Sequence, residues 1–117
     1  WVDHDEVLRV LGHAAALWFP SSWDEPLSRV LLEALACATP IIAMPTGGTS
    51  DIIVDGESGL LAPDIDAFVA AARRLAADPA LVATLRQHAR ARAVSTFAVD
   101  AVIARYLAAY AALEHQP

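Results

Sequence analysis

The chain has 117 residues, of which 56% are hydrophobic and 19% are charged, and its formal net charge is −6. This composition supports one folded domain with a hydrophobic core and argues against disorder. The acidic residues concentrate in the first half, where only Arg9 and Arg29 oppose them. Nucleic-acid binding is therefore not expected, because phosphate contacts need clustered cations.

The sequence shows no run approaching the roughly 20 apolar residues of a membrane span, and its first residues are acidic, unlike a signal peptide. We therefore expect a soluble, cytoplasmic protein. The chain starts at Trp1 without a Met, so we expect its natural N-terminus to lie elsewhere. Cys37 has apolar neighbours and is expected to be a small core residue. The four histidines show no metal-ligand spacing, and no metal is predicted.

Helices and short buried strands are predicted to alternate in the first half. The expected elements are a helix over 6–11, a strand over 15–19, a helix from Pro26 to about Ala38, a strand over 41–44 and a helical turn over 51–54. Asp3 or Asp5 can cap the first helix. Pro26 suits the first turn of the second helix, where a missing N–H costs nothing. Trp18 is expected in the core.

The second half is predicted to be mainly helical. The expected elements are a strand over 60–62, a helix over 66–77 with Phe68, Val69, Ala72 and Leu75 inward, a helix from Pro79 to about Val94, and a last helix over about 99–113. Strands that alternate with helices indicate an α/β fold with a parallel sheet. Three short strands are too few for a complete doubly wound domain, so we expect a partial Rossmann-like sheet with flanking helices.

The most informative stretch is 25–33, which follows a buried strand and opens a helix. Ligands of open α/β sheets bind at the carboxyl ends of the strands, and a helix N-terminus there suits phosphate. Along one helix, Glu25 and Glu33 would lie about 12 Å apart. Leu27 would then lie on the apolar face, and Glu33 would point out of the core on the side of Arg29. This spacing fits a long polyol ligand with a charged centre, because carboxylates accept hydrogen bonds from hydroxyls.

Each of these features also has a purely structural interpretation. Glu25 can serve as a helix-dipole partner, and both Glu33 and Arg29 can be solvated residues on the face of a helix. Gly47 and Gly48 can form a simple turn after a strand. From the residues alone, both interpretations stay open.

The ordered set of motifs resembles the large family of retaining glycosyltransferases called glycosyl transferases group 1, which have the GT-B fold. Its signature is a Glu, seven residues and a second Glu, followed by a Pro-containing strand and a Gly-Gly loop. The matching runs are FPSSWDEPLSRVLLEALACATPIIA at 19–43, TGG at 46–48, DII at 51–53 and DGESGLL at 55–61. The resemblance covers essentially the whole chain. It implies that residues 1–117 are the second half of the C-terminal, nucleotide-sugar-binding domain, without the N-terminal acceptor domain.

The resemblance also implies roles for the two acids and the glycines. Glu25, as the catalytic residue, would accept hydrogen bonds from hydroxyls of the donor sugar. Glu33 would bind the ribose hydroxyls of the nucleotide. Gly47 and Gly48 would allow close backbone approach near the sugar.

The diphosphate would face the backbone N–H groups of Leu27, Ser28 and Arg29. Family members usually have Gly at the position of Ser28, and a side chain there narrows the space beside the phosphates. The family's Arg and Lys that neutralise the diphosphate lie upstream of this motif and are absent from the chain. Arg29 is the cation nearest to the motif. No metal and no cofactor are implied, since the nucleotide sugar is a substrate.

The implied activity is transfer of a glycosyl group, with retention of configuration, from a nucleotide-diphosphate sugar to a sugar, lipid or small-molecule acceptor. The site would stabilise an oxocarbenium-like transition state electrostatically. The isolated chain is expected to be inactive, and any peripheral membrane contact would come from the N-terminal domain. Two alternatives stay open, namely a nucleotide-sugar epimerase of the same architecture and a non-catalytic nucleotide-binding or scaffold module.

Overall fold

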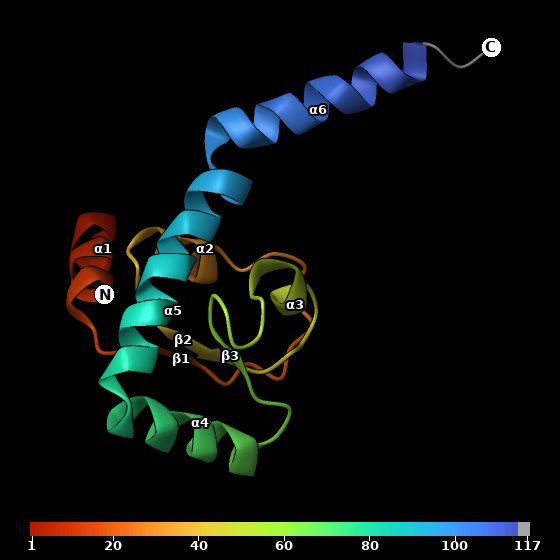
Figure 1. Ribbon diagram of the computed structural model, residues 1–117. Coiled ribbons are helices and arrows are strands. Elements are labelled where there is room, and N and C mark those ends of the chain that lie inside the picture. Colours follow the sequence, from red (N-terminus) through yellow and green to blue (C-terminus); the bar gives the residue numbers. More distant parts are fainter. Residues whose placement is uncertain (115–117) are drawn as a thin grey trace.

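The computed structural model describes residues 1–114, so His115, one of the four histidines, lies outside the described residues. The elements in chain order are α1 (His4–His13), β1 (Leu17–Phe19), α2 (Arg29–Ala36), β2 (Ile41–Ala43), α3 (Thr49–Ile52), β3 (Leu60–Leu61), α4 (Ile65–Ala77), α5 (Pro79–Arg92), the π-helical segment η1 (Ala93–Phe97) and α6 (Val99–Glu114). Figure 1 shows the strands in the middle of the molecule, with α1 and α2 on one side and α4 on the other.

Within residues 1–114, the strands form one parallel three-stranded sheet in the order β1-β2-β3. The central strand β2 is buried on both faces, as a parallel strand between helical layers should be. Ile41 and Ala43 of β2 pack into one core with α1, α2 and α3, whereas Ile42 packs into a second core with α4. The prediction of a partial Rossmann-like parallel sheet with flanking helices is therefore confirmed.

Helices α1, α4 and α5 each begin at an aspartate that accepts a hydrogen bond from the backbone N–H three residues further on. The caps are Asp3, Asp64 and Asp78, at donor–acceptor distances of 2.9, 2.8 and 2.9 Å. Such caps satisfy one of the N–H groups that a helix leaves unpaired at its start. Of the two aspartates proposed for α1, Asp3 is thus the cap.

Arginines of α5 bind the carbonyl groups at the ends of the other helices. Arg86 donates to Ala14 O (2.8 Å) at the end of α1 and to Ala38 O (3.2 Å) just after α2. Arg90 donates to Ala36 O (2.7 Å), the last residue of α2. A cation at these positions pairs unsatisfied carbonyls and complements the negative end of each helix. Helix α5 thereby ties α1 and α2 together.

Arg92 extends this arrangement to α3. Its guanidinium donates to Ile52 O (2.6 Å) and Asp51 O (2.7 Å), and it lies 5.5 Å from the centre of the Phe97 ring. The π-helical segment η1 begins directly after Arg92 and ends at Phe97. Arg92 therefore joins α3 to the end of α5 through charge-assisted hydrogen bonds and a cation–π contact.

Helix α2 begins three residues later than predicted. The residues after Pro26 do not enter the helix, since Ser28 is its N-cap with extended backbone angles (φ −82°, ψ 117°). The local preference of Pro for a first helical turn was therefore overridden. Leu27, predicted to lie on the apolar face, is 54% exposed.

The end of α2 also differs from the prediction. The helix stops at Ala36 rather than at about Ala38, because Ala38 adopts a left-handed φ of 56°. Thr39 N then donates to Ala34 O (2.8 Å), which closes the end of the helix. Such a left-handed residue is a common way to end a helix, although Gly usually occupies it.

The prediction that Trp18 belongs to the core is wrong. Trp18 is 61% exposed, and β1 is an edge strand among the described strands. The Trp18 ring meets Phe68 edge to face, with ring centres 6.1 Å apart. Val69, predicted to point inward from the same helix, is 43% exposed.

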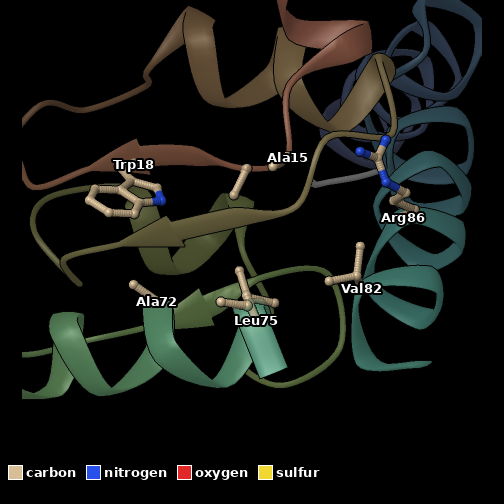
Figure 2. A pocket seen from close by; sticks show the side chains of 8 residues that line it. Ala15, Trp18, Ala72, Leu75, Val82 and Arg86 are labelled. Atoms are coloured by element: carbon tan, nitrogen blue, oxygen red, sulfur yellow. The ribbon is translucent and has the colours of Figure 1, made fainter. Parts of the chain in front are cut away.

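A largely apolar pocket of about 430 Å³ lies between β1, α4 and α5. Figure 2 shows the side chains of α4 facing β1 across this space, with Arg86 at one end. The labelled residues that line it are Ala15, Trp18, Ala72, Leu75, Val82 and Arg86. This pocket therefore lies beside β1, an edge strand among the described strands.

Helix α6 extends away from the α/β body (Figure 1). Its large apolar side chains are exposed, among them Ile103, Tyr106, Leu107 and Tyr110. By length and composition alone, the helical run Pro79–Leu113 contains an 18-residue window that could cross a membrane, with a mean hydropathy of 1.4 and none of it buried. The expectation that no apolar run approaches a membrane span did not include this window.

We predict that Arg92→Met lowers the free energy of unfolding by about 2 kcal/mol, because two carbonyls of α3 lose their charged donor. Arg74→Met, at an exposed position of α4, is the matched control and should change stability by less than about 0.5 kcal/mol. Urea denaturation of the two variants and the wild type measures both values. Equal stability of the two variants would show that Arg92 does not tie α3 to α5.

Candidate functional site

Two loops meet at the carboxyl ends of neighbouring strands. One loop follows β1 and leads to α2, and the other follows β2 and leads to α3. Thr46 Oγ1 in the second loop donates to Ser21 O in the first (2.9 Å). In open α/β folds this edge of the sheet is where ligands bind, so the fold brings the predicted motifs to the expected place.

The glycines of the second loop are bonded to the segment around Glu25. Gly48 N donates to Glu25 O (2.9 Å), and Gly47 N donates to Asp24 Oδ1 (3.0 Å). A Cβ atom on Gly48 would lie 2.0 Å from Pro26 O, and one on Gly47 would lie 2.4 Å from Glu25 O. Only glycine permits this contact, and Gly47 also has a φ of 50° that favours glycine.

This contact refines the interpretation of the Gly-Gly loop. The sequence predicted close backbone approach at Gly47 and Gly48, and the structure shows one between two loops of the chain itself. A simple turn after a strand would not require both residues to lack a side chain. The role of the glycines beside a sugar stays a prediction.

Glu25 is held in the loop rather than on α2. Its backbone N donates to Trp23 O (2.9 Å), and its carbonyl accepts from Gly48 N. Glu25 is half-buried. Three residues separate it from Arg29, the first residue of the helix. The spacing of about 12 Å along one helix axis is therefore wrong, because only Glu33 belongs to the helix.

Glu33 lies on α2 between two basic side chains. Its Oε1 is 3.7 Å from His4 Nε2 on α1 and 3.9 Å from Arg29 Nη2 one turn earlier. Both distances exceed hydrogen-bond range, so the two basic side chains are in ion-pair contact with the carboxylate without a direct hydrogen bond. The side chain of Glu33 is 21% exposed. The predicted orientation toward the side of Arg29 is what the structure shows.

Glu33 also lines a pocket of about 380 Å³ between α2, α5 and η1. The other residues that line it are Leu32, Ala36, Arg90, Ala93, Val94, Phe97 and Ala98. Glu25 is not among them. Glu25 therefore lies in the loop before α2, whereas Glu33 lies just over one turn inside the helix and lines this pocket.

The start of α2 presents backbone N–H groups at the same edge of the sheet. Within the described residues, Ser28 is buried and its side chain makes no capping hydrogen bond, and the first turn holds no acidic residue. Helix geometry leaves the N–H groups of Arg29, Val30 and Leu31 without intrahelical acceptors. Of the predicted set, Arg29 is in the first turn, Ser28 is the cap and Leu27 precedes it.

His4 is a neighbour of Glu33 that the sequence did not reveal. It stands 29 positions before Glu33, and neither residue lies in a motif that predicts their contact. Within residues 1–114, no group of three or more His, Cys, Asp and Glu could hold a metal. The groups that could hold a ligand here are the two carboxylates, the first-turn N–H groups and the side chains of Arg29 and His4.

The sequence of the chain matches a known protein family. The model of the family glycosyl transferases group 1 matches residues 1–92. The chain belongs to this family. The resemblance seen in the motifs is thereby confirmed.

Curated relatives agree with this membership. The chain is 37% identical over 98 residues to a glycogen synthase of Mycobacterium tuberculosis, an alignment that covers 82% of this chain and 23% of the relative. It is 40% identical over 80 residues to an alpha-maltose-1-phosphate synthase of Mycolicibacterium smegmatis, and this alignment covers 62% of this chain and 21% of the relative. The chain thus spans about a quarter of the length of these relatives.

Solved structures show the same fold. A sucrose-phosphate synthase from Thermosynechococcus elongatus superposes with a TM-score of 0.83 at 34% identity, covering 96% of this chain and 28% of that one. The Anabaena protein HepE, solved in complex with UDP-glucose, superposes with a TM-score of 0.72 at 23% identity. This superposition covers 89% of this chain and 30% of the HepE chain. The chain therefore has the architecture of part of a GT-B protein.

We predict that Gly48→Ala lowers the free energy of unfolding by about 1–3 kcal/mol, as overpacking of a close contact does. The added methyl group cannot fit against Pro26 O without moving the Glu25 loop. Gly12→Ala, where an added Cβ has no neighbour within 4 Å, is the matched control and should be neutral or stabilising. Thermal unfolding of both variants tests this, and unchanged stability of Gly48→Ala would refute the contact between the loops.

Proposed function

We propose that this chain is the donor-binding part of a retaining glycosyltransferase that uses a nucleotide-diphosphate sugar. The observation that carries the proposal is the bonded pair of loops, which fixes Glu25 at the carboxyl end of β1 in front of the first turn of α2. Membership of the glycosyl transferases group 1 family supports the reaction class. The structure of HepE with UDP-glucose supports a nucleotide sugar as the ligand.

In this proposal the ligand crosses the start of α2. The first-turn N–H groups receive the diphosphate, helped by the positive end of the helix dipole. Glu33, just over one turn into the helix, accepts hydrogen bonds from the ribose hydroxyls, and Arg29 adds a positive charge close to it. Glu25 accepts hydrogen bonds from hydroxyls of the donor sugar, next to Gly47 and Gly48.

The proposed chemistry is mainly electrostatic. As the bond to the leaving diphosphate breaks, negative charge grows on the phosphate, which the first-turn N–H groups and Arg29 stabilise. Glu25 orients the sugar and offsets the positive charge that develops on its ring. The acceptor hydroxyl then bonds to the anomeric carbon from the face that the diphosphate leaves, and its proton passes to the departing phosphate oxygen. This front-face attack retains the configuration without a nucleophile from the protein.

The remainder of the enzyme is proposed to lie outside residues 1–117. Because the chain spans about a quarter of its relatives, we propose that an N-terminal domain binds the acceptor, which is a sugar, lipid or small molecule. Catalysis would need both domains, so the isolated chain would turn over no substrate.

We predict that Glu33→Ala weakens nucleotide-sugar binding about 10- to 100-fold, because the ribose loses charged hydrogen-bond acceptors. Calorimetry of the intact protein with UDP-glucose, ADP-glucose and GDP-glucose measures the affinity. Glu57→Ala, on the exposed turn before β3, is the control and should bind like the wild type. Equal affinity of the two variants would contradict the role of Glu33, and failure of all three ligands to bind the wild type would contradict the proposed function.

We predict that Glu25→Ala lowers kcat far more than it raises KM, because contacts to the reacting sugar strengthen in the transition state. Initial rates of the intact enzyme with its donor and acceptor give both constants. The same reactions, followed by NMR, should give a product with the anomeric configuration of the donor. Normal kcat in the variant would remove Glu25 from catalysis, and an inverted product would exclude retention.

A further inference from the structure

The carboxylate of Glu25, the proposed catalytic residue, takes its direction from the backbone that carries it. Within residues 1–114 the side chain of Glu25 makes no hydrogen bond and no ion pair, so no partner side chain fixes it. The backbone is fixed on both sides instead, because Glu25 N donates to Trp23 O (2.9 Å) and Glu25 O accepts from Gly48 N (2.9 Å). A group that holds this backbone against the Gly-Gly loop therefore also orients the carboxylate.

Asp24 supplies such a support from the position next to Glu25. Its Oδ1 accepts a hydrogen bond from Gly47 N at 3.0 Å, across the space between the two loops. Gly47 packs directly on the backbone of both acids, since a Cβ on Gly47 would lie 2.4 Å from Glu25 O and 2.8 Å from the carbonyl carbon of Asp24. A carboxylate binds an N–H more strongly than a neutral oxygen does. Asp24 therefore closes the contact that the missing side chain of Gly47 permits.

We propose that Asp24 is a positioning residue for the donor sugar, because its bond to Gly47 N keeps the Glu25 carboxylate aimed at the sugar hydroxyls. This inference rests on the proposed function, in which Glu25 contacts the sugar and Glu33 contacts the ribose. Asp24 is exposed, and its role requires an acceptor oxygen at Oδ1 rather than a negative charge. The bond joins positions 24 and 47, so no local motif predicts it.

A second side-chain bond between the loops lies further from Glu25. Thr46 Oγ1 donates to Ser21 O (2.9 Å), four residues before Glu25. This bond holds the loops together near the end of β1, whereas the bond of Asp24 acts beside Glu25 itself. Loss of the Asp24 carboxylate should thus leave the loops in place and loosen the segment that carries Glu25. Misplacing a catalytic group by about 1 Å can lower a rate by about 100-fold, so a smaller displacement already has a measurable effect.

Steady-state kinetics of the intact protein test this inference, with UDP-glucose, ADP-glucose and GDP-glucose as donors and water as the acceptor. In this reaction the water oxygen bonds to the anomeric carbon, and the nucleoside diphosphate leaves with a proton from the water. Its release therefore measures the rate without a known acceptor. The inhibition constant of the matching UDP, ADP or GDP measures the affinity for the nucleotide part alone.

Two variants of Asp24 separate the acceptor oxygen from the charge. Asp24→Ala should lower kcat about 5- to 50-fold, raise KM less than about twofold and leave the inhibition constant of the nucleoside diphosphate unchanged. Asp24→Asn should keep at least about half of the wild-type kcat, because an amide oxygen also accepts from Gly47 N. The matched control is Asp55→Ala, which removes a similar exposed bond, from Leu61 N to Asp55 Oδ1 (2.8 Å), and should keep the wild-type constants.

The outcomes distinguish this inference from the proposed function. Normal kcat in Asp24→Ala overturns the inference, and so does an equal loss in Asp24→Asn or in Asp55→Ala. An Asp24→Ala variant that does not fold, or that is inhibited less by the nucleoside diphosphate, shows a role in the fold or at the nucleotide and overturns it as well. In all these cases the proposed function stands if Glu33→Ala weakens binding and Glu25→Ala lowers kcat. A wild type that releases no nucleoside diphosphate from any of the three donors contradicts both proposals.

Discussion

The backbone contact between Gly48 and Glu25 is the constraint on which the candidate site depends. Gly48 N donates to Glu25 O, and the two loops approach so closely that a Cβ on Gly48 would overlap Pro26 O. Because the loop is bound to its neighbour, the chain stays extended through Ser28, and α2 starts only at Arg29. This leaves Glu25 outside the helix and the first-turn N–H groups beside it, at the carboxyl edge of the sheet.

Much of the fold could be predicted from local pattern. The alternation of short apolar runs with helical segments indicated a parallel sheet, and β2 is buried on both sides as its unbroken apolar run required. The start of α2 could not be predicted, because the preference of Pro26 for a first helical turn is local, whereas the contact with Gly48 joins residues far apart in sequence. Trp18 was misplaced for a related reason. An apolar run does not show whether its strand will lie at an edge, and β1 does.

The site was predictable in its parts but not in its geometry. Helical periodicity placed Glu33 on the side of Arg29, and the two lie 3.9 Å apart. The same periodicity predicted that Glu25 and Glu33 lie along one helix. This prediction is wrong, because Glu25 lies in the loop before α2. His4 and the arginines of α5 carried no sequence signal, since their partners are carboxylate or carbonyl groups on other helices. These long-range contacts join α5 to the ends of α1, α2 and α3, and α1 to α2.

The most direct measurement is a crystal structure of the intact protein with the nucleotide sugar that binds it most tightly. We expect diphosphate oxygens within about 3 Å of the first-turn N–H groups of α2. We also expect ribose hydroxyls on the Glu33 carboxylate and sugar hydroxyls on Glu25, with the Gly48–Glu25 contact intact. A nucleotide bound elsewhere, with Glu33 still facing only His4 and Arg29, would contradict it.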